Sequence, residues 1–414
     1  MPKTITLRIS KLLNSIGPGP IIAAAFIGPG TVTACTLAGV NFGYSLLWAL
    51  LLSILVTMFL QEISSRIGII TRQDLSQLIR SGQKNKLLIY FSISLVFMAI
   101  GLGNAAYESG NISGATLGLQ VFGEFPQWHW KELSINTGNL FLGVLLALLL
   151  WFGSFKVLQR VLVALVIILS ISFVLTAILS KPDLASLITG FIPNPNSENL
   201  LTIVSLIGTT VVPYNLFLYA SLAKNKWTNE SQIPAMRRDI LVAVGFGGLV
   251  SMAIITVGAA NTSENINTAL DLSKGLESIF GSSAKYLIAL GLLGAGVTSS
   301  LTAPLATGLV ICGMFGWDQE TKSRPMRITM LIIIGLGVLF SSMGIRPVRL
   351  IILAQLANGI LLPLISGWII WIGSQHKLLG KHKNSWTLRS LGILIWLITF
   401  GLGMKSISLV FNWL

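Results

Sequence analysis

The sequence predicts an all-α polytopic membrane protein, and three observations support this fold class. Hydrophobic residues make up 53% of the 414-residue chain and charged residues only 10%, whereas soluble domains carry roughly 25% charged residues. The mean hydropathy is +0.80. Apolar runs of about 18 residues or more, long enough to cross a bilayer as helices, recur along the whole chain.

Eleven apolar segments follow one another, and the connections between them are mostly too short for a soluble domain. The third segment is long enough to be interrupted or strongly tilted. Cys35 and Cys312 lie inside apolar segments, so neither a disulfide nor a thiolate metal site is expected. We expect one membrane domain with spans at residues 17–39, 43–66, 87–120, 138–153, 157–180, 200–223, 238–260, 284–314, 326–343, 349–372 and 388–412.

The distribution of basic residues predicts the orientation of these spans. Three quarters of the 28 Lys and Arg residues fall on one side of an eleven-span topology, and cytoplasmic loops carry such an excess. We therefore expect a bacterial inner (plasma) membrane protein with its N-terminus in the cytoplasm and its C-terminus outside. Because the basic residues are spread between apolar segments, the net charge of +14 does not indicate a nucleic-acid partner. We expect a monomer in the lipid bilayer.

The first segment is interrupted by the stretch FIGPGTVT at residues 26–33. Proline removes a backbone donor, and a glycine on each side of Pro29 weakens the helix further. In lipid, such a break persists only where protein or a ligand satisfies the freed backbone groups. The hydroxyls of Thr31 and Thr33 lie where the second half of the helix begins, so we expect a binding site here.

A second break, GTTVVPYN at residues 208–215, lies in the sixth segment. Segments 1 and 6 open two successive halves of five segments each. Paired interruptions at corresponding positions indicate an inverted-repeat transporter with its site at mid-membrane, although a single proline also fits a kinked structural helix. The predicted repeats cover residues 17–180 and 200–372, and residues 388–412 form an extra helix.

Several motifs resemble the NRAMP divalent-metal transporters. They cover nearly the whole chain, and lie at residues 17–19, 28–31, 38–48, 66–75, 213–218, 295–299, 354–358 and 362–363. The resemblance implies a LeuT-like fold of two inverted five-helix repeats plus an eleventh helix, and alternating access between the two sides of the membrane.

The sequence departs from the family pattern at the residues that bind metal and handle protons. The family carboxylate, amide and thioether ligands and both histidines of its sixth helix are missing. On the third helix, an acid and an amide stand where the family has two acids. The departing residues are Gly28, Thr31, Val212, Tyr214, Tyr219, Glu108 with Asn111, and Val297.

These departures lead us to expect an anion rather than a metal as substrate. A divalent cation at mid-membrane needs formal negative charge, whereas a helix N-terminus without a neighbouring carboxylate attracts anions. We expect a secondary active transporter for a small monovalent anion, with bicarbonate as the best guess and transition metals excluded. The choice of bicarbonate also draws on the resemblance to NRAMP relatives that lack the metal site.

The expected site residues form three groups. Glu108 and Asn111 are candidates for proton handling or coupling. By analogy with LeuT-like transporters, a sodium ion is expected as coupling ion at the Ala24 and Ile27 carbonyls and the Thr298 and Ser299 hydroxyls. The expected substrate contacts are Gly28, Gly30, Thr31, Val32, Thr33, Thr209, Thr210, Tyr214 and Gln355.

Structural interpretations of the same residues stay open. Threonine hydroxyls in membrane helices often bond to their own helix carbonyls, and Tyr214 fits a role that fills space. Two interpretations of Gln355 and Asn358 are that they line the permeation path and that they join helices. For Glu62 and Arg66, at the cytoplasmic end of the second helix, the two interpretations are a gate and simple solvation at the membrane interface.

Other functions also stay open. They are proton-coupled transport of Mg²⁺ or Mn²⁺ in the manner of the NRAMP family, transport of a small amino acid, and a channel or sensor role. No hydrolase elbow or phosphate loop is present, so an enzyme is not expected.

Overall fold

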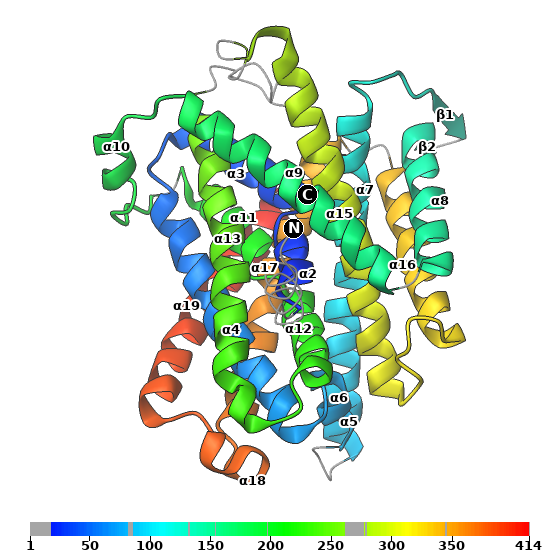
Figure 1. Cartoon of the computed structure of the whole chain (residues 1–414), viewed down its shortest axis with the longest axis vertical. Helices are drawn as coiled ribbons and strands as arrows, with labels where there is room; N and C mark the ends of the chain where they lie inside the picture. Colours follow the sequence, from blue (N-terminus) through cyan, green and yellow to red (C-terminus); the bar gives the residue numbers. More distant parts are fainter. Residues whose placement is uncertain are drawn as a thin grey trace, which may run out of the picture.

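The computed structural model describes residues 18–81, 86–130, 133–153, 155–196, 198–260, 277, 280–343 and 346–413. Figure 1 shows a bundle in which most helices run along the long axis. We call the end of the bundle that carries α5 (Leu75–Ser81) and α18 (His376–Leu379), at the bottom of Figure 1, the lower end. The basic N-terminal stretch of the sequence lies outside the described residues.

The first half of the chain begins with a helix in two parts, α2 (Gly19–Phe26) and α3 (Pro29–Phe42). A π-helical stretch, η1 (Phe97–Leu102), interrupts the third predicted segment, as its length indicated. A two-stranded antiparallel hairpin, which the sequence did not predict, follows α7. The other elements are α4 (Leu47–Thr71), α6 (Lys86–Val96), α7 (Gly103–Leu119), β1 (Gln127–Trp130), β2 (Leu133–Asn136), α8 (Thr137–Phe152), α9 (Phe155–Leu179) and α10 (Leu184–Thr189).

The second half also begins with a helix in two parts, α11 (Leu200–Thr210) and α12 (Pro213–Lys226). Both predicted helix breaks are therefore confirmed. The remaining elements are η2 (Glu230–Gln232), α13 (Ile233–Ala259), η3 (Gly281–Ser283), α15 (Ala284–Phe315), α16 (Arg324–Ser341), α17 (Pro347–Gly373), η4 (Gly380–His382) and α19 (Trp386–Trp413).

The apolar helices agree with a multi-pass membrane protein. Within the described residues, eight helices are long and apolar enough to cross a membrane, and nine if the bent pair α2–α3 counts as one span. The apolar helix α8 and the described apolar part of α9, Ile167–Leu179, are shorter. The total of eleven spans and the division into two repeats stay predictions.

The two broken helices lie in the middle of the bundle, as Figure 1 shows for α2, α11 and α12, whereas α8 and α10 lie at its edge. Helix α7 packs against α15, α16 and α17, and α3 packs against α13 and α11. The two breaks are therefore enclosed by helices from both halves of the chain and are shielded from lipid.

Helices α3 and α13 cross with their backbones in direct contact. A Cβ at Gly39 would overlap the Ile255 carbonyl and lie 2.6 Å from the Ala259 nitrogen. On the other side, a Cβ at Gly258 would lie 2.6 Å from the Thr36 carbonyl. Small residues allow this close approach between membrane helices.

Replacing Gly39 with alanine is therefore expected to lower the midpoint of thermal unfolding, since the two backbones must separate to admit the methyl group. Overpacking of this kind costs about 1–3 kcal/mol. Gly401→Ala is the matched control, because nothing lies within 4 Å of a Cβ there. Fluorescence-detected size exclusion after heating measures the melting temperature of each variant. Equal melting temperatures of Gly39→Ala and Gly401→Ala would contradict the close crossing.

Candidate functional site

The first break separates α2 from α3 by Ile27 and Gly28, and the two helices are bent by 51°. Gly28 has an extended ψ of 178°, and Pro29 is the first residue of α3. The Thr31 hydroxyl donates to the Phe26 carbonyl, 2.8 Å away, and so bonds to the end of the preceding half. This hydrogen bond commits the threonine proton and leaves its oxygen lone pairs free to accept.

The second break follows the same pattern. The Thr210 hydroxyl donates to the Leu206 carbonyl at 2.7 Å, and the Thr210 carbonyl accepts from Thr57 of α4 at 3.3 Å. The Thr209 hydroxyl lies 3.1 Å from the Thr31 hydroxyl and joins the two breaks directly. Because the Thr31 proton already points to Phe26, Thr209 is the donor of this pair.

Gln355 of α17 contacts both breaks. A Cβ at Gly30 would overlap the Gln355 side-chain nitrogen and lie 3.0 Å from the Thr209 hydroxyl oxygen. A Cβ at Gly208 would overlap the Gln355 backbone carbonyl. Nearby, the Asn358 side chain donates to the Gly208 carbonyl at 3.3 Å. Gln355 is therefore brought to the site, whereas Asn358 joins α17 to α11.

Helices α7 and α15 close the other side of the first break. A Cβ at Gly28 would overlap the Ser299 hydroxyl and lie 3.4 Å from the Tyr107 hydroxyl. The Tyr107 ring contacts the Tyr214 ring edge-on, with centroids 5.6 Å apart. The family aspartate would therefore not fit at position 28 unless Ser299 moved, which is a steric reason for glycine here.

Buried polar atoms without a hydrogen-bond partner gather around the two breaks. They come from α3, α4, α7, α12, α15 and α17, and their residues are at most 2% exposed. An unpaired buried polar atom costs about 1–3 kcal/mol, so a group of them indicates a place for water or a polar substrate. Within the described residues they belong to Thr33, Gln61, Glu108, Tyr214, Asn215, Ser299, Ser300 and Gln355.

Glu108 is the only acid in this group. One carboxylate oxygen accepts from the Asn111 side chain at 3.1 Å, and the other has no partner among the described residues. Its Cγ packs on α16, where a Cβ at Gly337 would lie 2.6 Å away. The structure thus brings Glu108 and Asn111 together, and their role in proton handling or coupling stays a prediction. In the described part of the chain, no group of three or more His, Cys, Asp or Glu side chains could hold a metal ion.

The residues expected to bind sodium are only partly placed to do so. Ser299 reaches the first break, and its hydroxyl is unpartnered. The Thr298 hydroxyl instead donates to the Ala295 carbonyl at 2.9 Å. Ala24 and Ile27 are buried at the end of α2. Sodium binding at these four residues stays a prediction.

Sequence reasoning missed four residues of the site. Gln61 and Asn215 have unpartnered nitrogen and oxygen atoms although both side chains are fully buried. Tyr107 and Ser300 lie beside residues that were predicted. An amide inside the apolar segment 43–66 was an available signal for Gln61. Of the predicted contacts, Val32 contributes only a buried apolar side chain.

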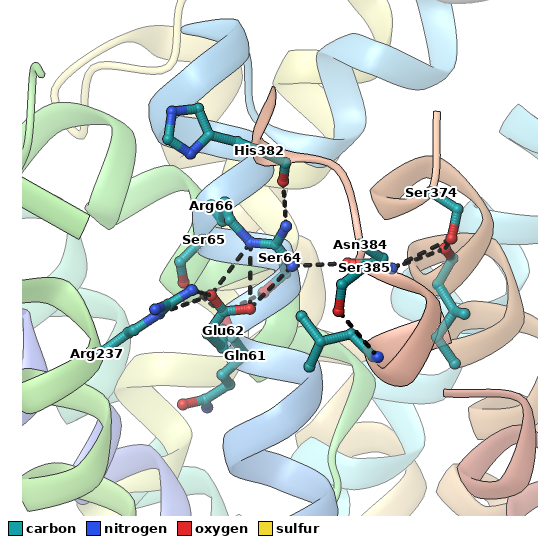
Figure 2. Close-up of polar contacts among 12 residues, drawn as sticks. Gln61, Glu62, Ser64, Ser65, Arg66, Arg237, Ser374, His382, Asn384 and Ser385 are labelled. Carbon is teal, nitrogen blue, oxygen red and sulfur yellow. Dashed lines mark hydrogen bonds and ion pairs between the residues drawn. The ribbon is translucent and has the colours of Figure 1, made fainter. Parts of the chain in front are cut away.

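Charged side chains join the helices at the lower end of the bundle, and Figure 2 shows these contacts in detail. Glu62 of α4 accepts from Arg66 at 3.0 Å and from Arg237 of α13 at 2.8 Å. Arg66 also donates to the His382 carbonyl and to the Asn384 side chain, the latter at 2.7 Å. We call Glu62, Arg66, Arg237 and Asn384 the lower clasp. It favours the gate interpretation of Glu62 and Arg66.

Two further groups of contacts lie at this end. Asp74, after α4, accepts from Lys224 of α12 at 3.0 Å and from Gln319 at 2.9 Å. Glu230 accepts from Lys381 at 2.7 Å and from His382 at 2.8 Å. Hydrogen bonds from Lys381 and His382 lower the pKa of Glu230. Together these contacts tie α4, α12, α13 and the α17–α19 connection to one another.

Known proteins resemble this chain along most of its length. A Nostoc sp. protein described as divalent metal cation transporter MntH is 28% identical over 411 residues, which cover 95% of this chain and 90% of the relative. A Deinococcus radiodurans protein of the same description is 27% identical over 360 residues, with 84% and 78% covered.

Solved structures confirm the LeuT-like fold. A manganese transporter from Eremococcus coleocola matches with a TM-score of 0.78 at 21% identity, covering 96% of this chain and 87% of that one. Mhp1, a nucleobase-cation-symport-1 family transporter, matches with a TM-score of 0.53 at 14% identity, with 96% and 90% covered.

The expected sodium-coupled transport of a small anion, with bicarbonate as the best guess, is wrong, because the relatives are named divalent metal cation transporters. The same finding contradicts an inorganic anion as partner and the exclusion of metals. The physical reason lies at the breaks. Each break joins the C-terminus of one half helix to the N-terminus of the next, so their partial charges of about −0.5 and +0.5 offset each other. The hydroxyls of Thr31 and Thr210, two of the expected substrate contacts, already donate to helix carbonyls and so have no proton left for an anion.

The predicted family resemblance is confirmed along the chain. The family model described as "Natural resistance-associated macrophage protein-like" matches residues 19–409, which include both helix breaks and the helices that enclose them. This chain belongs to the Nramp family of membrane transporters.

Proposed function

We propose that this protein transports a hard divalent cation, Mn²⁺ or Mg²⁺, across the membrane with proton coupling at Glu108. One observation carries the proposal: the unpartnered polar atoms around the broken helices include one carboxylate oxygen, that of Glu108, and the others, such as those of Asn215 and Gln355, are neutral. A buried carboxylate among neutral polar groups favours a positively charged guest. The names of the relatives, divalent metal cation transporters, support the same class of substrate.

The threonines of the breaks fit a cation as well. When a hydroxyl donates its proton to a helix carbonyl, as Thr31 does, its oxygen turns lone pairs toward the site. Mn²⁺ and Mg²⁺ prefer oxygen ligands, and Mg²⁺ in particular keeps several of its waters. We therefore expect a partly hydrated cation, held by hydroxyl and amide oxygens near one carboxylate.

Glu108 supplies formal charge and a proton site in this proposal. Ionised, it attracts the cation from α7, and after the cation leaves, it binds a proton and becomes neutral. A buried acid in a membrane helix bundle is typical of such a relay. Asn111 holds one oxygen of the carboxyl group, and the other has no partner among the described residues.

The proposal includes an orientation. Most Lys and Arg residues lie toward the end that carries α5, α18 and the α15–α16 connection, which favours a cytoplasmic lower end. In this orientation the lower clasp closes the cytoplasmic side, and the cation enters from the opposite side. A bacterial inner membrane with a cytoplasmic N-terminus and an external C-terminus fits this arrangement.

Competition between cations in proteoliposomes tests the proposal. Mn²⁺ uptake is expected to be inhibited by Mg²⁺ about tenfold more strongly than by Cd²⁺, because Val212 supplies no thioether for a soft cation. Empty liposomes serve as the control. Stronger inhibition by Cd²⁺ than by Mg²⁺ would contradict an oxygen-only site, and absence of both Mn²⁺ and Mg²⁺ uptake would contradict the proposed function.

A further inference from the structure

An apolar groove of about 500 Å³ opens on the outside of the bundle, away from the two breaks. It lies between the π-helical stretch η1, the end of α15 and one face of α16. Phe97, Leu102, Phe315, Ile328 and Ile332 line it, and all five are more than 40% exposed. The residues that the structure describes therefore leave this groove uncovered.

The length of the groove matches the depth of one membrane leaflet. Along α16 its lining runs from Arg324 to Leu336, which corresponds to about 18 Å at roughly 1.5 Å per residue. Half of the hydrocarbon core of a bilayer is about 15 Å thick. One extended acyl chain fits these dimensions, whereas a water-soluble ligand would gain nothing from this lining.

The groove ends in groups that suit a lipid headgroup. Arg324 is the one charged side chain among its lining residues. It is exposed, and none of the ion pairs between described residues involves it. Trp317, stacked on Phe315 with ring centroids 5.0 Å apart, lies at the same end. Tryptophan and arginine are typical of the headgroup level of a membrane.

The charges around Arg324 come from the α15–α16 connection, from α16 and from α5, whose Arg80 guanidinium lies against Gly316. Asp318 and Glu320 oppose it, and Lys322 and Arg327 add to it. The Arg327 guanidinium lies over the Trp151 ring of α8, 4.9 Å from its centroid, and is therefore occupied elsewhere. Arg324 begins α16, where the helix dipole adds about half a positive charge. The balance at the groove end is positive and fits a phosphate.

We infer that this groove binds a phospholipid of the lower leaflet, with one acyl chain along α16 and the phosphate on Arg324. The bound chain packs on η1, which continues directly into the helix that carries Glu108. The lipid thereby contacts the π-helical stretch at Phe97, Gly101 and Leu102. This inference requires a membrane location only and is independent of the transported ion.

Two variants test the acyl and phosphate parts separately. Gly101→Leu adds an apolar side chain at the groove, where the nearest atom to a Cβ, on the Phe97 ring, is 3.7 Å away. Arg324→Ala removes the phosphate contact and leaves the groove intact. The matched controls are Gly335→Leu on α16, where a Cβ has nothing within 4 Å, and Lys322→Ala, which is exposed and does not line the groove.

Native mass spectrometry of the purified full chain, titrated with phosphatidylglycerol, measures the retained lipid. The wild type and both controls are expected to retain one tightly bound lipid that Gly101→Leu loses, and Arg324→Ala is expected to weaken it about tenfold. Diacylglycerol, which lacks the phosphate, should bind the wild type and Arg324→Ala equally weakly. Retention of phosphatidylglycerol by Gly101→Leu at the wild-type level would overturn the groove assignment, and unchanged affinity in Arg324→Ala would overturn the phosphate assignment.

Discussion

Replacing Glu108 with glutamine is expected to slow Mn²⁺ uptake about a hundredfold and to abolish its dependence on pH. Glu108 is the only acid among the residues with unpartnered atoms around the breaks, so the variant leaves a divalent cation with neutral ligands. Removing one partner of a buried charge pair costs about 3–5 kcal/mol, and a hundredfold change corresponds to about 3 kcal/mol. Uptake of ⁵⁴Mn²⁺ into proteoliposomes between pH 5.5 and 8 measures both effects.

The Glu108→Gln variant removes the negative charge and keeps the size of the side chain. Its side-chain oxygen still accepts from Asn111, so the melting temperature should stay within a few degrees of the wild type. Glu198→Gln, at an exposed position, is the matched control and should transport normally. If Glu108→Gln transports Mn²⁺ at the wild-type rate with the same pH profile, the carboxylate has no part in the mechanism.

Replacing Glu62 with glutamine is expected to open the lower end of the bundle. Glu62 accepts from both Arg66 and Arg237, and Arg66 is only 3% exposed. Hydrogen bonds to charged groups contribute about 1.5–3 kcal/mol. Loss of one such contribution shifts the equilibrium between closed and open lower ends about tenfold toward the open state.

Alkylation of a cysteine placed at position 215 measures this shift. Asn215 lies in the first turn of α12, below the second break, and is 1% exposed. The native Cys35 and Cys312 are both buried and should react slowly. Glu62→Gln should raise the alkylation rate about tenfold, whereas Glu198→Gln should have no effect, because Glu198 is exposed and takes part in none of the contacts at the lower end. Equal rates with and without Glu62→Gln would show that the lower clasp does not close this end.

The positions of the helix breaks could be predicted because they depend on local backbone chemistry. Pro29 and Pro213 each begin the second half of a broken helix, as their missing N–H groups require. The pairing of the two breaks followed from their equivalent places in the chain. Family membership likewise followed from short motifs that keep their order along the sequence.

The direction of the hydroxyl protons at the site could not be predicted in this way. Thr31 was expected to donate to a substrate, but the bend brings the Phe26 carbonyl to its hydroxyl. Which carbonyl comes within reach depends on the angle between two half helices, and the residue pattern does not encode that angle. The site also depends on Gln61 and Asn215, whose unpartnered atoms are visible only when their neighbours in space are known.

The substrate prediction failed because it considered only the N-terminus of the second half of each broken helix. An N-terminus alone attracts anions, yet α3 follows directly on the C-terminus of α2, and α12 on that of α11. The missing aspartate at position 28 also has a steric reason in Ser299. Its absence therefore does not by itself indicate an anion, and Glu108 supplies negative charge from a neighbouring helix.

The sign of the charge that a substrate carries across the membrane tests the central claim most directly. Proteoliposomes adsorbed on a solid-supported membrane are exposed to a step of MnCl₂ or MgCl₂ at constant chloride and pH. A transported divalent cation should move positive charge into the liposomes, with a current that saturates and that Glu108→Gln suppresses. Two results together would contradict the claim. Neither cation would produce a current, and labelled bicarbonate, supplied instead, would accumulate in the liposomes and move negative charge into them.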